Sequence, residues 1–221
     1  MKLLLNALIK FLIGLLLVGL LIFLPAGTLA YPSGILFLCL LFIPMLVMGI
    51  VMLARARDLL AKRLDTKEKQ AAQKGVQSLS GLVFIAGFLL AGLDFRFSWS
   101  DVPMPAVIAA SVIFLLGYGL YAEVMRENAY LSRTVKVEEG QTVISTGLYG
   151  IIRHPMYTAS ILMFLSIPLV MGSWYALIPF AFYPALMVIR IKDEEKLLTA
   201  ELQGYEEYKR KVKYRMIPFI W

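Results

Sequence analysis

The sequence has very few residues that could bind a metal or form a disulfide. Cys39 is the only cysteine and His154 the only histidine. One thiol cannot form a disulfide framework, and a protein zinc site usually needs three or four Cys, His or carboxylate ligands. Charged residues are also scarce, at 17%, whereas soluble domains carry about 25%. These shortages argue against a metal site and against an ordinary soluble domain.

The uncharged residues are concentrated in long runs, at 11–54, 75–93, 103–122 and 155–189. About 20 apolar residues in a helix cross the hydrocarbon core of a bilayer, and a helix satisfies its own backbone there. The sequence therefore predicts an all-α polytopic membrane protein with about six transmembrane helices. We expect them near residues 3–24, 33–54, 78–93, 105–125, 156–170 and 173–192, the last two forming a short hairpin.

The first 30 residues allow a second interpretation. Lys2 and Lys10 give the chain a basic start, and an apolar run follows at 11–24. Thr28-Leu29-Ala30 resembles a cleavage site for a secretory signal. The apolar stretch is long for a signal peptide, which favours a retained first helix. Both interpretations remain open from the residues.

The positions of Lys and Arg predict the orientation. With the N-terminus inside, all but Arg96 of the 22 Lys and Arg residues fall on the cytoplasmic side. This places a multi-pass protein in the cell membrane with both termini cytoplasmic. The net charge of +7 then indicates attraction to anionic headgroups rather than nucleic-acid binding. Residues 55–77 then form a cytoplasmic loop, and its polar, helix-favouring part at 65–77 is interpreted as a solvated connector.

Two polar clusters flank the C-terminal apolar run. Arg153, His154 and Pro155 begin it, and the free amides of a helix start favour an anion. Arg190 and Glu194 end it, one helical turn apart, so that they can pair on one face. Either arginine could bind a substrate anion, or could simply anchor a helix at the headgroups. The charged helix expected over 193–214 would close the cytoplasmic face.

The clusters occur together with further motif residues. These are Asn128, Gly147-Leu148-Tyr149, Arg153-His154-Pro155-Met156-Tyr157, Arg190 to Glu194-Glu195, Tyr205-Glu206-Glu207-Tyr208 and Ile217-Pro218. Their order and spacing resemble the isoprenylcysteine carboxyl methyltransferases and the related phospholipid methyltransferases. The resemblance divides the chain into N-terminal transmembrane helices at 1–125 and a methyltransferase-like region at 126–221. It says little about the first part.

The resemblance implies an integral membrane methyltransferase that uses S-adenosyl-L-methionine, with a cytoplasmic cofactor pocket capped by the C-terminal helix. It implies Arg190 as the substrate-side and catalytic arginine. The residues themselves add Arg153 as a second candidate for substrate binding and His154 as a second catalytic candidate. The implied cofactor-binding residues are Lys136, Gln141, Thr142, Val143, Ile144, Tyr149, His154, Pro155, Met156, Tyr157 and Glu194. The family often has His at position 141 and Pro at 148, where this chain has Gln and Leu.

The acceptor is left open by the sequence. A membrane lipid, an isoprenylcysteine-like carboxylate, another lipidic acid, an amine or a small thiol would all fit, with no metal or nucleic acid as partner. A carboxylate needs no general base, whereas an amine or thiol would need one, and His154 is then the first candidate. The alternatives are an NADPH-dependent sterol-type membrane reductase, which has a similar Arg-His-Pro-x-Tyr region, and a non-catalytic membrane protein.

Overall fold

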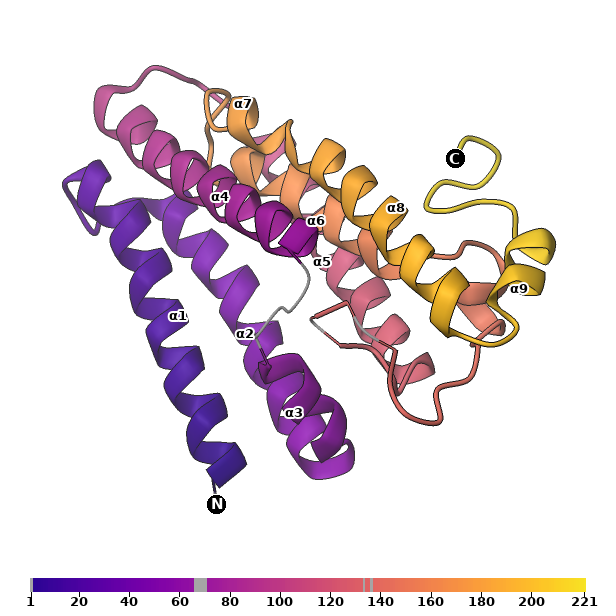
Figure 1. The fold of residues 1–221 in the computed structure, drawn as a ribbon. Coiled ribbons are helices and arrows are strands. Elements are labelled where there is room, and N and C mark those ends of the chain that lie inside the picture. The colour runs from indigo at the N-terminus through magenta and orange to yellow at the C-terminus, as the bar shows by residue number, and fades with distance from the viewer. Residues whose placement is uncertain (1, 66–70, 133, 136) are drawn as a thin grey trace.

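The computed structural model describes residues 2–65, 71–132, 134–135 and 137–221. The described residues form helices and connecting loops without a strand, which confirms the all-α class (Figure 1). The long helices are α1 (Lys2–Ala26), α2 (Pro32–Arg55), α4 (Ala71–Phe97), α5 (Met104–Glu127), α6 (Pro155–Val170) and α8 (Tyr183–Glu201). The short ones are α3 (Arg57–Leu64), the 3₁₀ turn η1 (Gly147–Gly150), α7 (Leu177–Phe180) and α9 (Tyr205–Lys211).

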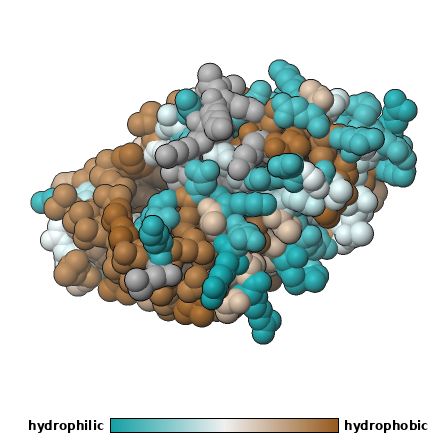
Figure 2. All heavy atoms as spheres, turned by 60° about the horizontal axis from the view of Figure 1, so that its bottom comes forward, coloured by the Kyte–Doolittle hydropathy of each residue, from teal (hydrophilic) through white to brown (hydrophobic). Residues whose placement is uncertain are grey.

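Among the described residues, four helices are long and apolar enough to cross a membrane: α1, α2, α4 from Gln73 onward, and α5. Helix α6 is apolar but shorter, with 16 residues. The apolar surface is concentrated on one side of the molecule, over α1 and α2, whereas hydrophilic residues gather toward the α9 end (Figure 2). Helix α1 buries few of its side chains against the protein. Its exposed leucines are therefore suited to contact lipid rather than a protein core.

Glycines allow the helices to approach closely at three points. A Cβ at Gly92 of α4 would lie 2.5 Å from the carbonyl oxygen of Ile22 in α1. A Cβ at Gly117 of α5 would lie 2.6 Å from the Met163 side chain in α6, and one at Gly87 would overlap the Phe180 ring. Close backbone approach at small residues is a general means of packing membrane helices, because lipid tails supply no hydrophobic drive between them.

A polar cluster ties the helices together at the end remote from α9. The buried carboxylate of Asp94 accepts hydrogen bonds from the amide and hydroxyl of Ser100, at 2.7 and 2.6 Å, and from the Ser173 hydroxyl. The hydroxyl of Tyr31 donates to the carbonyl of Met171 nearby. These bonds join the α1–α2, α4–α5 and α6–α7 connections. The sequence analysis did not single out Asp94.

Three predicted elements need correction. The charged helix predicted over 193–214 is divided between the end of α8 and α9, and Gly204 between them has a positive φ of 85°. The second limb of the hairpin, predicted as one helix over 173–192, is broken into α7 and α8. The cause is Pro184, which occupies the first turn of α8, where a proline lacking an amide hydrogen is well tolerated. The predicted cytoplasmic loop at 55–77 contains the helix α3, and the last residues of the connector predicted at 65–77 belong to α4.

Candidate active site

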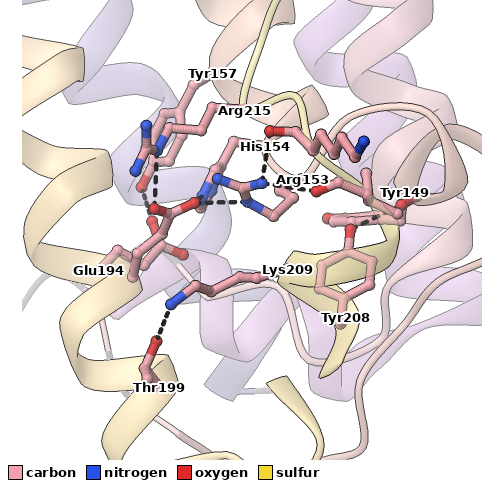
Figure 3. Close-up of polar contacts among 12 residues, drawn as sticks. Tyr149, Arg153, His154, Tyr157, Glu194, Thr199, Tyr208, Lys209 and Arg215 are labelled. Atoms are coloured by element: carbon pink, nitrogen blue, oxygen red, sulfur yellow. Dashed lines mark hydrogen bonds and ion pairs between the residues drawn. The ribbon is translucent and has the colours of Figure 1, made fainter. Parts of the chain in front are cut away.

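The start of α6 and the charged second half of α8 lie side by side. Tyr157, one turn into α6, donates its hydroxyl hydrogen to Glu194 Oε2 at 2.5 Å and accepts a hydrogen bond from Arg190 Nε at 3.0 Å. The Arg190 and Glu194 that the sequence predicted to pair therefore both meet the Tyr157 hydroxyl. Figure 3 shows Tyr157 and Glu194 turned toward one another.

Glu195, which sequence reasoning named only as part of a motif, is the centre of the ionic network. One of its oxygens accepts from Arg153 Nε at 2.7 Å and lies 3.2 Å from His154 Nε2, and the other accepts from Arg215 Nε at 2.8 Å. The side chains of Glu195, Arg153 and His154 are all buried. Burial raises the pKa of the Glu195 carboxyl, but hydrogen bonds from His154, Arg153 and Arg215 outweigh this and lower it to about 2. The carboxylate is thus kept charged.

The segment after α9 completes this network. Arg153 Nη1 donates to the carbonyls of Val212 and Lys213, at 2.6 and 2.9 Å. The amides of Arg153 and His154 donate to the carbonyls of Tyr214 and Arg215. Arg153, which was predicted on the substrate side, therefore makes mostly structural contacts in this arrangement (Figure 3).

Acid pH should weaken the fold through Glu195. Its folded pKa of about 2 lies below the ordinary value of 4.5. The stabilisation is therefore complete above pH 4.5 and is lost as the pH falls toward 2. We expect the unfolding temperature in detergent to decrease below pH 4.5. The Glu195→Gln variant should show a shallower decrease, and an equal decrease in both proteins would contradict this assignment.

A pocket open to solvent lies beside these residues. It is lined by nearly all the described residues predicted for the cofactor and substrate: Gln141, Thr142, Val143, Ile144, Tyr149, Arg153, His154, Met156, Tyr157, Arg190 and Glu194. His154 and Glu194, on which the prediction depended most, thus border one space. Pro155 is buried in the first turn of α6 and is not among the lining residues. Lys136 lies outside the described residues.

Other residues of the pocket wall were not predicted for the site. They are Asn128, Tyr130, Leu131, Ser132, Thr134, Val135, Leu198, Leu202, Tyr205 and Tyr208. Asn128 donates to the Tyr149 hydroxyl at 3.0 Å, and the Tyr208 hydroxyl donates to the Tyr149 carbonyl at 2.7 Å. Asn128 and the two tyrosines of α9 were part of the quoted motif, so the signal for them was present in the sequence.

A larger, apolar cavity of about 540 Å³ adjoins this pocket between α2, α3, α4, α5, α6 and α8. The two spaces share a wall formed by Met156, Tyr157 and Arg190. The cavity is lined largely by apolar side chains and is unusually rich in methionine: Met45, Met48, Met52, Met125, Met156, Met163 and Met187. Flexible thioether side chains adapt to irregular apolar ligands. The site therefore joins a polar pocket to an apolar one.

Comparison with known proteins agrees with this geometry. Residues 105–206 match the phospholipid methyltransferase family. The chain also resembles the solved structure of the eukaryotic intramembrane Ras methyltransferase, an isoprenylcysteine carboxyl methyltransferase, with a TM-score of 0.52, 15% identity, and coverage of 85% of this chain and 74% of that one. The family match confirms the predicted relationship to these methyltransferases, and the structural likeness confirms the polytopic fold. Together they support a membrane methyltransferase.

The curated relatives are of another class. A Delta(14)-sterol reductase of Mus musculus is 31% identical over 91 residues, which are 40% of this chain and 22% of the relative. A Delta(14)-sterol reductase of Methylotuvimicrobium alcaliphilum is 23% identical over 136 residues, which are 55% of this chain and 32% of the relative. The chain thus matches only about a quarter to a third of the length of these reductases.

Proposed function

We propose that this protein is an integral membrane methyltransferase that binds S-adenosyl-L-methionine in the polar pocket and methylates an acceptor whose apolar chain lies in the methionine-rich cavity. The observation that carries the proposal is the shared wall of Met156, Tyr157 and Arg190. Only at such a wall can a water-soluble donor and a lipidic acceptor meet.

The residues of the polar pocket suit this cofactor. A carboxylate, Glu194, and the faces of Tyr149 and Tyr205 line it, and these groups match an adenosine with ribose hydroxyls and a cationic sulfonium. The Tyr205 hydroxyl is buried and has no hydrogen-bond partner among the described residues. A buried polar group without a partner is costly, and a bound nucleoside would relieve that cost.

The polar pocket is narrow. Its volume of about 100 Å³ is below the ~300–1,000 Å³ of typical ligand pockets. Binding of a nucleoside therefore requires the walls to separate, and this movement would also expose the Tyr205 hydroxyl to the ligand.

When bound, S-adenosyl-L-methionine supplies a methyl group activated by a sulfonium, which a nucleophile takes by in-line displacement. The chain's own task is to align the acceptor with that methyl group and to exclude water. Arg190 can hold a carboxylate acceptor, and the Tyr157 hydroxyl fixes Arg190 and Glu194 relative to one another. His154 Nε2 faces the Glu195 carboxylate. We therefore assign His154 a positioning role rather than that of a general base, which favours a carboxylate acceptor over an amine.

We further propose that the α9 end faces the cytoplasm of a cell-membrane protein, as the distribution of Lys and Arg predicts. The cofactor would then enter from water, and the acceptor from the inner leaflet. Cysteines introduced at Glu139, on the predicted cytoplasmic side, and at Asp101, on the predicted outer side, should be accessible to labelling from opposite sides of sealed vesicles.

An NADPH-dependent reductase is the second candidate, because the curated relatives are sterol reductases. Titration of the purified protein in detergent with S-adenosylhomocysteine and with NADPH separates the two. Binding of S-adenosylhomocysteine that is lost in Glu194→Ala supports methyl transfer. Binding of NADPH instead would make the reductase correct, and binding of neither would contradict both.

Tyr205 and Tyr208 allow a matched test of the cofactor pocket. The Tyr208 hydroxyl is bonded to the Tyr149 carbonyl, whereas that of Tyr205 has no described partner. Tyr205→Phe should weaken binding of S-adenosylhomocysteine about 5- to 10-fold, since a hydrogen bond contributes about 1 kcal/mol, and should leave the unfolding temperature unchanged or raised. Tyr208→Phe should lower the unfolding temperature. Unchanged binding in Tyr205→Phe would contradict a contact with the ligand.

A further inference from the structure

Arg63 is a cation of α3 that borders the methionine-rich cavity, outside the region matched by the family. Its Nη1 donates to the Ser132 carbonyl at 3.1 Å and lies 3.7 Å from the Met156 sulfur, and its Nη2 donates to the Tyr121 hydroxyl. The guanidinium also stacks on the Tyr121 ring, 5.4 Å from its centroid. Arg63 thus reaches Met156. Met156 belongs to the wall between the polar pocket and the cavity, where Arg190 contacts Tyr157.

Arg63 also borders a second apolar space, a groove of about 410 Å³ between α1, α2 and α3. The groove and the cavity share Leu41, Met45, Gly49, Leu60 and Arg63. In Figure 1, α1 and α2 diverge toward the end where α3 lies. The groove beside α1 and α2 therefore adjoins the cavity that reaches the wall of the cofactor pocket, and together the two spaces mark an apolar path to that wall.

The charges along this path have one sign. Among the described residues, Arg63 and Arg190 line the cavity, Lys10 and Arg63 line the groove, and no Asp or Glu lines either space. Lys10 also donates to the carbonyl of Leu64, which keeps its ammonium near the α3 end of the groove. An anionic headgroup would be attracted along this path, and a cationic amine would be disfavoured.

We propose that Arg63 recognises the anionic headgroup of the acceptor lipid, which enters sideways between α1 and α2 and is delivered to Arg190. This inference rests on the proposed methyltransferase function and extends it, because it makes the N-terminal helices part of the acceptor site. Arg63 is then a specificity residue for an acidic amphiphile, and the amine headgroup of a phospholipid is not the acceptor.

The probes for this proposal are N-acetyl-S-farnesylcysteine and its neutral carboxamide, with binding followed by thermal unfolding in detergent. The wild-type protein should bind the acid at least 10-fold more tightly than the amide. Arg63→Gln should lose most of this preference, Arg63→Lys should retain part of it, and Arg57→Gln, an exposed arginine of the same helix, should behave as wild type. Equal binding of acid and amide by the wild type, or an unchanged preference in Arg63→Gln, overturns the proposal.

The path itself is tested at Gly49, which borders both spaces and has open space where a Cβ would lie. Gly49→Leu should weaken binding of the acid at least 5-fold without lowering the unfolding temperature. Gly19→Leu, at a glycine of α1 with similar open space, should not weaken binding of the acid. Titration with S-adenosylhomocysteine distinguishes failure of the acceptor path from failure of the methyltransferase function. We expect the Arg63 and Gly49 variants to bind this compound with unchanged affinity. A wild-type protein that does not bind this compound contradicts the methyltransferase function itself.

Discussion

Replacing Glu195 with glutamine should destabilise the protein by about 3–5 kcal/mol, since removal of one partner leaves buried charges uncompensated. Arg153, His154 and Arg215 all contact this carboxylate, and Arg153 is buried. Such a loss is a large part of the ~5–15 kcal/mol that stabilises a typical protein. Thermal unfolding in detergent measures it directly.

The same substitution should also weaken binding of S-adenosylhomocysteine, because His154 and Arg153 form part of the pocket wall. Glu206→Gln is the matched control: Glu206 pairs with Lys209 at 2.9 Å on the exposed face of α9, where ion pairs contribute little. A double variant, Glu195→Gln with Arg153→Met, should recover part of the stability, because the buried guanidinium charge is then removed as well. If Glu195→Gln and Glu206→Gln unfold at the same temperature, the central role of Glu195 is wrong.

Replacing Arg190 with glutamine should reduce methyl transfer by about 10²-fold, the order of loss when a reacting group is no longer held in line. The guanidinium stands at the wall between the two spaces and donates to Tyr157. The measurement is incorporation of radiolabelled methyl groups from S-adenosyl-L-methionine into a lipid extract of the native host. Binding of S-adenosylhomocysteine should change much less than the rate.

The control for Arg190 is Lys192→Gln, two residues along α8, where the side chain is exposed. Arg190→Lys should recover only part of the activity, because an ammonium cannot reproduce the planar fork of a guanidinium. A rate of methyl transfer in Arg190→Gln within a few-fold of wild type would contradict the role of Arg190 in the acceptor site.

Much of the fold follows from the sequence because the bilayer imposes a simple rule on helix length. The four long spans lie within a few residues of the predicted ranges, except that α4 begins seven residues earlier than residue 78, at Ala71. That extension is polar, and its Gln73 donates to Asp193 at 2.6 Å. Hydropathy cannot detect a helix that continues beyond the lipid into contact with another helix.

The site was predicted less completely, for reasons of geometry. Glu194 and Glu195 are adjacent, so they point about 100° apart on α8, and the sequence does not show which faces the pocket and which faces Arg153. Arg63 lay in the predicted cytoplasmic loop at 55–77 and was not predicted for the site, because its charge there indicated only the orientation of the chain. Its proximity to Met156 depends on the packing of α3 against α5, which no local pattern reveals.

The residues after α9 have a consequence for the biosynthesis of this protein. Val212, Lys213, Tyr214 and Arg215 provide the carbonyls that hold Arg153 and His154, and Arg215 supplies one of the cations around Glu195. Every residue lining the polar pocket has already been made when the ribosome reaches Lys211. The nascent chain at that stage lacks the carbonyls that bind the Arg153 guanidinium and the backbone amides of Arg153 and His154. The contacts that fix Arg153 and His154 therefore form only after residues 212–215 have been made, and a chain released at Lys211 would contain the pocket residues without the order that makes them useful.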